Sequence, residues 1–164
     1  MKHLFLFVVY GCLVFNANAQ DSLPELLKRY NTNNIPYISV QELAMPKTQA
    51  IILDTREKVE FKTSHIKNAM FVGFNNFEID TVLKKIPDKT SKIVVYCSIG
   101  IRSETIASKL KKAGYNNVYN LYGGIFEWKN NHFAVYNSQE KKTDSIHAFS
   151  EPWSKWLKQG IKVF

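Results

Sequence analysis

Short apolar runs alternate with segments of helical periodicity along most of the chain. Runs of four or five residues that are rich in β-branched side chains predict buried strands. The predicted strands are residues 37–40, 50–53, 69–72, 92–96 and 118–121. Apolar residues three and four positions apart predict helices at residues 23–30, 59–61, 74–83, 104–113 and 125–129. Strands that alternate with helices are typical of α/β domains with a parallel sheet.

The clearest predicted strand, residues 92–96, has three successive β-branched residues and leads directly into Cys97. A helix is expected a few residues later, at residues 104–113, and Gly114 is suited to end it. Cys97 should therefore lie between a central parallel strand and the N-terminus of a helix. Open α/β sheets bind their ligands at this edge.

The pattern weakens beyond residue 132. Residues 133–150 are polar and are expected to be irregular, whereas Trp153, Trp156 and Leu157 predict an amphipathic helix over residues 151–158. We expect this C-terminal extension, which ends at residue 164, to pack on the core domain.

The length of 164 residues suits one domain, because single domains commonly have roughly 100 to 150 residues. We place that domain at residues 37–132, after a helical lead-in at residues 20–36. Nothing in the sequence indicates an obligate assembly, and we expect a monomer.

The first nineteen residues resemble a secretory signal peptide. Lys2 precedes an apolar run that begins at Leu4, and Ala17 and Ala19 form a small-x-small cleavage site. We expect cleavage after Ala19, which makes Gln20 the mature N-terminus. The protein should then be exported, to the periplasm or to the medium.

The apolar run of this leader is interrupted by Gly11 and Asn16, so it is short for a membrane span, which needs about 20 apolar residues. We therefore expect no membrane span in the mature form. Lipidation of Cys12 is the alternative, which bulky Tyr10 and the apolar residues after Cys12 disfavour.

The formal net charge of +8 is carried by lysines that are scattered along the chain. They do not form a basic stripe interleaved with aromatic residues, so we expect no nucleic-acid partner. A basic surface does favour a small anionic substrate through long-range attraction.

Once the leader is removed, Cys97 is the one remaining cysteine, and no intramolecular disulfide can form. A lone thiol in an oxidising compartment is either buried and inert or kept for its chemistry.

The loop after this cysteine favours the second alternative. It reads Cys97-Ser98-Ile99-Gly100-Ile101-Arg102-Ser103. Backbone N–H groups converge at a helix N-terminus and stabilise an anion there. Gly100 can adopt a positive φ, and Arg102 adds a permanent cation. Both features should lower the pKa of the thiol, which predicts that Cys97 is the catalytic residue and that Ser98 to Ser103 form the substrate cradle.

Together with three other segments, this loop resembles the rhodanese family. The segments are Leu53-Asp54-Thr55-Arg56-Glu57 followed by Glu60-Phe61, Ser64-His65-Ile66 with Ala69, and Leu121-Tyr122-Gly123-Gly124-Ile125 with Trp128. The resemblance covers roughly residues 37–128. The chain departs from the family pattern at Ser64, Lys67 and Asn68, which affects turn geometry and not the cysteine loop.

The resemblance implies a three-layer α/β/α fold with a five-stranded, mostly parallel central sheet. It also implies a sulfurtransferase that needs no metal or organic cofactor. The thiolate of Cys97 would take the outer sulfur of a donor such as thiosulfate, and the persulfide would pass that sulfur to a thiol or to cyanide.

The resemblance also implies roles for the other site residues. Arg102 would orient the oxyanion of the donor. Arg56 would contact substrate, with an ion pair to a nearby acid as the alternative, and Asp54 and His65 would support the site structurally. His132 and His147 lack ligand spacing, so we expect no zinc site.

Two alternatives to sulfur transfer remain for a sequence of this kind. Phosphatases and arsenate reductases of the same fold have five residues between cysteine and arginine, whereas four separate Cys97 from Arg102. The shorter loop favours sulfur transfer over phosphate chemistry. A binding or sulfur-carrier module without high turnover is the remaining alternative.

Overall fold

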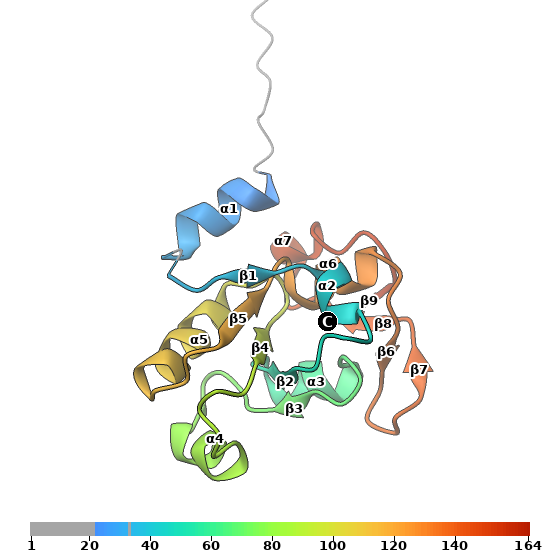
Figure 1. Cartoon of the computed structure of the whole chain (residues 1–164). Coiled ribbons are helices and arrows are strands. Elements are labelled where there is room, and N and C mark those ends of the chain that lie inside the picture. The colour runs from blue at the N-terminus through green and yellow to red at the C-terminus, as the bar shows by residue number, and fades with distance from the viewer. Residues whose placement is uncertain (1–21, 33) are drawn as a thin grey trace, which may run out of the picture.

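The computed structural model describes residues 22–32 and 34–164, and a five-stranded parallel sheet lies at its centre (Figure 1). The strand order is β1-β5-β4-β2-β3, and every neighbouring pair is parallel. The strands are β1 (Tyr37–Ile38), β2 (Ile51–Asp54), β3 (Met70–Phe71), β4 (Ile93–Tyr96) and β5 (Val118–Leu121). The predicted fold class is confirmed. The predicted signal peptide, Cys12 and Gln20 lie outside the described residues.

Helices cover both faces of this sheet. They are α1 (Leu23–Tyr30), α2 (Val40–Ala44), α3 (Lys58–Thr63), α4 (Ile79–Lys85), α5 (Arg102–Lys112), α6 (Gly124–Asn130) and α7 (Glu151–Ser154). Within the described part of the chain, none of them is long and apolar enough to cross a membrane.

Strand β4 shows how the layers are held together. Its four residues are fully buried, with Val94 and Tyr96 in the apolar cluster beneath α2 and α6. Ile93 and Val95 belong to the opposite cluster, beneath α4 and α5. Side chains alternate between the two faces of a strand, so a strand that is apolar at every position must be covered on both sides.

Several predicted elements are shorter than expected, among them the strand predicted at residues 69–72, which spans only Met70–Phe71. The strand predicted at residues 37–40 ends at Ile38, because the Ser39 Oγ caps α2 by accepting a hydrogen bond from the Glu42 N–H at 3.1 Å. The helix predicted at residues 74–83 begins only at Ile79. Phe74 and Phe77 pack against the core from a turn, so their spacing reflects packing and not a helix.

The prediction that residues 133–150 are irregular is wrong. This segment contains β6 (Val135–Tyr136) and β7 (Lys142–Thr143), which pair antiparallel, and β8 (Ser145–His147). Strand β8 pairs in parallel with β9 (Ile161–Val163).

The helix predicted at residues 151–158 ends early, at Ser154. The Asn130 side chain from α6 binds the backbone beyond that point. It accepts a hydrogen bond from the Lys158 N–H at 2.7 Å and donates one to the Trp156 carbonyl at 2.9 Å. These bonds take the place of further helical ones.

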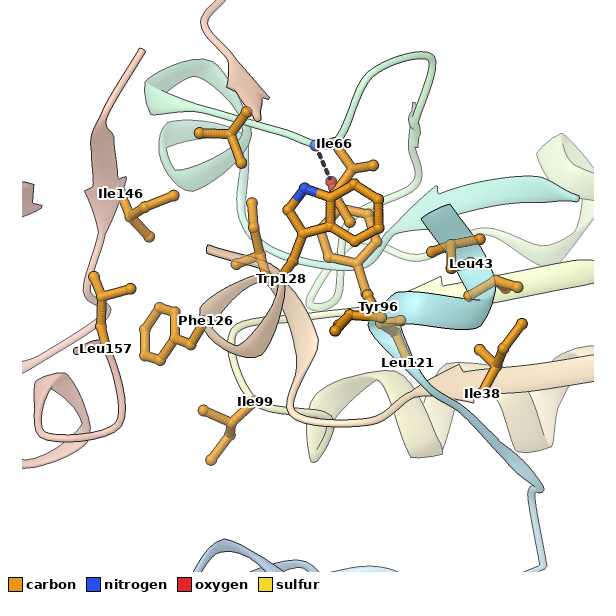
Figure 2. Close-up of a cluster of buried hydrophobic side chains, with 14 of the residues drawn as sticks. Ile38, Leu43, Ile66, Tyr96, Ile99, Leu121, Phe126, Trp128, Ile146 and Leu157 are labelled. Atoms are coloured by element: carbon orange, nitrogen blue, oxygen red, sulfur yellow. Dashed lines mark hydrogen bonds between the residues drawn. The ribbon is translucent and has the colours of Figure 1, made fainter. Parts of the chain in front are cut away.

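The C-terminal segment packs on the domain core through its apolar side chains. Ile146 and Leu157 belong to the same buried cluster as Phe126 and Trp128 of α6 (Figure 2). The Trp128 indole N–H donates to the Ala134 carbonyl at 3.0 Å, so Trp128 is a core residue.

Candidate active site around Cys97

Cys97 follows the last residue of β4 and is buried at the carboxyl end of the sheet. The Gly100 N–H donates to its sulfur at 3.2 Å, and Gly100 has a φ of 102° that allows the loop to turn back. The Ser103 hydroxyl oxygen lies 3.5 Å from this sulfur. The loop therefore curls around the sulfur and directs the Gly100 N–H at it.

The N-terminus of α6 holds the backbone of this loop. The Ile125 and Phe126 N–H groups donate to the carbonyls of Cys97 and Ser98 at 2.9 and 3.1 Å. A Cβ at Gly124 would collide with the Cys97 carbonyl oxygen, so the close approach requires glycine at this position.

Two buried asparagines brace the other side of the loop. The Asn120 amide donates to the Gly100 carbonyl at 2.8 Å, and its oxygen accepts from the Ser103 hydroxyl at 2.7 Å. Asn31 donates to the same carbonyl at 3.0 Å. Sequence reasoning missed both residues. Asn120 was detectable, because it is a polar residue within an otherwise apolar buried strand.

The guanidinium of Arg102 pairs with Glu60 of α3 through a bidentate contact. Two of its nitrogens donate to the two carboxylate oxygens, each at 2.7 Å, and one also donates to Ser98 Oγ at 3.0 Å. The Ser98 hydroxyl donates to Glu60 Oε1 at 3.1 Å. Burial opposes ionisation of Glu60, but the hydrogen bonds and charge of Arg102 lower its pKa. Sequence reasoning gave Glu60 no role at the site.

The surroundings of Cys97 favour its thiolate. Burial raises the pKa of the thiol, but the positive charge of Arg102 and the hydrogen bonds from Ser103 and Gly100 outweigh this effect and lower the pKa below its usual value. The nucleophilic form is therefore more populated near neutral pH than for a free cysteine.

A pocket of about 160 Å³ opens at Cys97. Four loop residues and two aromatic residues of the C-terminal segment join Cys97 in its lining: Ser98, Ile99, Ile101, Arg102, Phe149 and Trp153. Gly100 and Ser103 contact the sulfur without lining the pocket. Sequence reasoning predicted all the loop residues, but neither Phe149 nor Trp153 as part of the site.

The family model of the rhodanese-like domain matches residues 39–131, more than half of the chain. The chain belongs to the rhodanese-like domain family. The match includes the cysteine loop, α3 with Glu60, and the N-terminus of α6. It excludes Phe149 and Trp153.

Two relatives of this rhodanese-like chain have different names and lengths. Thiosulfate sulfurtransferase GlpE of Coxiella burnetii is 31% identical over 98 residues, which cover 60% of this chain and 88% of the relative. A tRNA uridine(34) hydroxylase of Onion yellows phytoplasma is 34% identical over 97 residues, which cover 56% of this chain and 32% of the relative. This chain thus spans only about a third of the hydroxylase's length.

Solved structures also share the rhodanese-like fold. The crystal structure of a thiosulfate sulfurtransferase from Pseudomonas aeruginosa superposes with a TM-score of 0.57 at 24% identity, over 75% of this chain and 23% of that chain. At this identity the likeness shows the fold alone.

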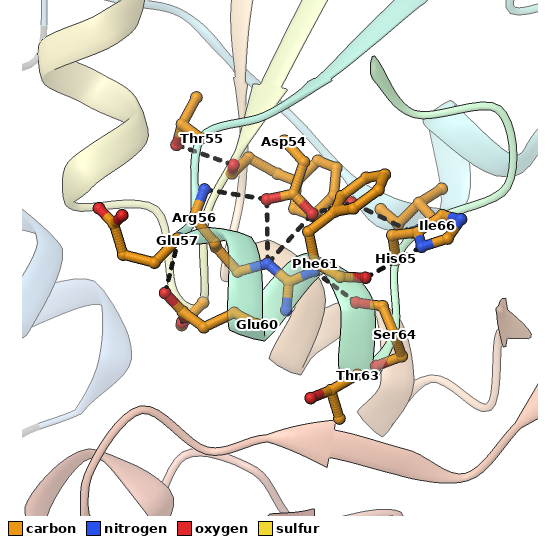
Figure 3. A network of polar contacts seen from close by, with 12 residues as sticks. Asp54, Thr55, Arg56, Glu57, Glu60, Phe61, Thr63, Ser64, His65 and Ile66 are labelled. Atoms are coloured by element: carbon orange, nitrogen blue, oxygen red, sulfur yellow. Dashed lines mark hydrogen bonds and ion pairs between the residues drawn. The ribbon is translucent and has the colours of Figure 1, made fainter. Parts of the chain in front are cut away.

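Arg56 lies in the rhodanese-like core and does not line the pocket. Figure 3 shows its guanidinium beside the Asp54 carboxylate, with the closest atoms 2.6 Å apart and both side chains fully buried. The same guanidinium donates to the Ser64 carbonyl at 2.6 Å. The structure shows the ion-pair alternative for Arg56, whose side chain is completely buried and does not line the pocket.

His65 links α3 to the turn between β6 and β7. One ring nitrogen lies 3.1 Å from the Phe61 carbonyl and the other 3.1 Å from the Glu140 carboxylate, and the ring stacks on that of Phe61. Asp54 and His65 thus both have structural contacts. Across residues 22–32 and 34–164, no cluster of three or more His, Cys, Asp or Glu side chains is arranged to hold a metal ion.

Proposed function

We propose that this rhodanese-like domain is a sulfurtransferase that carries a sulfur atom on Cys97. The observation that supports this most directly is the thiol itself, which lies at a pocket, accepts a hydrogen bond from the Gly100 N–H and has a lowered pKa. The name of the Coxiella burnetii relative, a thiosulfate sulfurtransferase of similar domain length, points to the same chemistry.

The proposed reaction has two steps. The Cys97 thiolate attacks the outer sulfur of a donor such as thiosulfate, a new S–S bond forms, and the S–S bond of the donor breaks as sulfite leaves with the electron pair. A thiolate or cyanide acceptor then attacks the terminal sulfur of the persulfide, and Cys97 leaves as the thiolate. The positive charge of Arg102 and the N–H of Gly100 stabilise the negative charge on Cys97 before and after the transfer.

The spacing of four residues between Cys97 and Arg102 favours this reaction over phosphatase or arsenate reductase activity. The pairing of Arg102 with Glu60 does not separate the two reactions, because phosphate and the sulfonate end of thiosulfate would both compete with this carboxylate for the forked donors. We expect aryl phosphates to be poor substrates.

Mass spectrometry of the intact protein tests the proposal. Incubation with a sulfur donor should add the mass of one sulfur atom, and the adduct should disappear when cyanide is added. Cys97→Ser should form no adduct and lose all transfer activity while keeping its fold, because a hydroxyl is a far weaker nucleophile at neutral pH. If no donor forms the adduct and the thiol titrates near the free value of about 8.5, the chain is a binding module instead.

We also propose that the protein is exported, on the basis of the leader sequence from Lys2 to Ala19. Intact mass measured on the exported fraction of an expressing bacterium should correspond to a chain that begins at Gln20. A mass that retains residues 1–19, or one that includes lipid on Cys12, would contradict this.

A further inference from the structure

The pocket at Cys97 has apolar walls that come from two distant parts of the chain. Ile99 and Ile101 belong to the cysteine loop, whereas Phe149 and Trp153 belong to the C-terminal segment outside the family match. Strand β8 brings this segment against α3, and its pairing with β9 holds it there. Among the described residues that line the pocket, Arg102 is the one cationic side chain.

The forked hydrogen-bond donors of Arg102 are already occupied by a carboxylate of the protein. Glu60 accepts two hydrogen bonds from the guanidinium, and its side chain is almost fully buried, so solvent does not weaken the pair. The ring of Phe149 lies 4.7 Å from the guanidinium carbon and covers one face of it. An inorganic dianion in the pocket would have to compete with Glu60 for Arg102 while it approaches the Cys97 thiolate.

The conformation of Phe149 gives further reason to assign its ring a role. Its φ is 67°, which is rare for a bulky residue, and its N–H donates to His147 Nδ1 at 3.1 Å. The ring is 46% exposed, so it contributes little to the buried core. A strained backbone that presents an apolar ring at a pocket suggests a function for that ring.

We propose that this pocket selects sulfur donors whose leaving part carries an apolar group, and that Phe149 is a determinant of this specificity. The volume of about 160 Å³ is similar to that of an apolar cavity of ~150 Å³ that accommodates benzene, so one ring fits. Organic thiosulfonates, R–SO₂–S⁻, are donors of this class. This inference rests on the proposed sulfur transfer.

The loading step is the same as with thiosulfate except for the leaving group. The Cys97 thiolate attacks the terminal sulfur of the thiosulfonate and forms the persulfide S–S bond. The S–S bond of the donor breaks, and the sulfinate R–SO₂⁻ leaves with the electron pair. The apolar R group remains against the pocket wall throughout the step.

A matched series of donors tests the proposal with the full chain. Thiosulfate, methanethiosulfonate and benzenethiosulfonate transfer the same sulfur atom and differ in the leaving part. The kcat/KM value for loading Cys97 is measured with each donor. It is then divided by the rate at which the same donor reacts with a small thiol in solution, which corrects for the intrinsic reactivity of the donor. The wild type should favour the benzene donor over the methane donor by about tenfold or more, with thiosulfate lowest.

Phe149→Gly should lower this preference about three- to tenfold, because it removes the ring that contacts the donor. Glycine adopts a positive φ without strain, so the variant should fold, which thermal unfolding checks. Phe164→Gly makes the same change at a residue that is exposed and lies outside the pocket, and it should leave the preference unchanged.

The outcomes distinguish this inference from the proposed function. If Cys97 is loaded but the corrected ratio of benzene to methane donor is near one, the inference is wrong and sulfur transfer stands. The inference is also wrong, and sulfur transfer still stands, if the folded Phe149→Gly variant prefers the benzene donor over the methane donor as strongly as the wild type does. If none of the three donors loads Cys97, the sulfurtransferase proposal itself fails.

Discussion

Two arginine–carboxylate pairs lie near the carboxyl ends of the central strands, in different surroundings. Asp54 and Arg56 are both completely buried, and the Tyr96 hydroxyl donates a further hydrogen bond to this carboxylate at 2.6 Å. The pair of Glu60 and Arg102 lies at the edge of the pocket, where the Arg102 side chain remains 16% exposed.

This difference in exposure separates two uses of the same side chains. The Asp54–Arg56 pair connects the end of β2 with the C-terminal end of α3, since Arg56 also binds the Ser64 carbonyl. Neither side chain lines the pocket at Cys97. The Glu60–Arg102 pair is close enough to Cys97 for its cation to lower the pKa of the thiol. One pair therefore supports the fold, and the other sets the electrostatics of the site.

The largest effect is expected when the buried pair is broken. Arg56→Ala leaves the Asp54 carboxylate buried without its cation, which should lower the free energy of unfolding by about 3–5 kcal/mol. Denaturant titration measures the free energy of unfolding. Lys58→Ala, at an exposed position of α3, is the control and should change this free energy by less than about 0.5 kcal/mol. Equal effects of the two substitutions would mean that the buried pair does not stabilise the fold.

Arg102→Ala should act on the chemistry more than on the fold. We expect the rate of sulfur transfer to fall by a factor that corresponds to about 1–3 kcal/mol, because Cys97 loses a nearby cation and Glu60 loses its partner. The measurement is kcat/KM for loading with thiosulfate, beside unfolding of the same variant. If Arg102→Ala destabilised the protein as much as Arg56→Ala does, the Glu60–Arg102 pair would support the fold as well, and the proposed difference between the two pairs would be wrong.

The pH dependence of the same variant sharpens this prediction. The thiolate is the reactive form, so the alkylation rate of Cys97 rises as the pH passes its pKa. In the wild type this rise should lie below the free-cysteine value of about 8.5, since the pKa is lowered. Arg102→Ala should move the rise to higher pH. Identical pH profiles would show that Arg102 does not act on the thiol.

Glu60→Gln should give the smallest effect. It removes the carboxylate charge that neutralises Arg102 while keeping the size of the side chain. Thiosulfate should then gain relative to benzenethiosulfonate by about three- to tenfold, or roughly 1 kcal/mol. The ratio of the two kcat/KM values measures this. An unchanged ratio would mean that Glu60 does not limit access of an anion to Arg102.

Local sequence was enough to predict the sheet and the position of the cysteine loop. The β-branched run at residues 92–96 forms β4, and Cys97, Gly100 and Arg102 lie where the pattern predicts. These features depend on neighbours in the chain: a strand that is apolar on both faces must be buried, and a loop before a helix presents its N–H groups.

The partners of these residues were decided by the tertiary structure. Glu60 is separated from Arg102 by 42 positions, and Asn120 from Gly100 by 20, so no local pattern shows that they meet. Phe149 reaches the pocket only because β8 pairs with β9 and packs against α3. The sequence by itself determined that Cys97 follows a central strand. Folding decided that Glu60 pairs with the cation beside this thiol and that two aromatic side chains line its pocket, because long-range packing alone sets which side chains share a site.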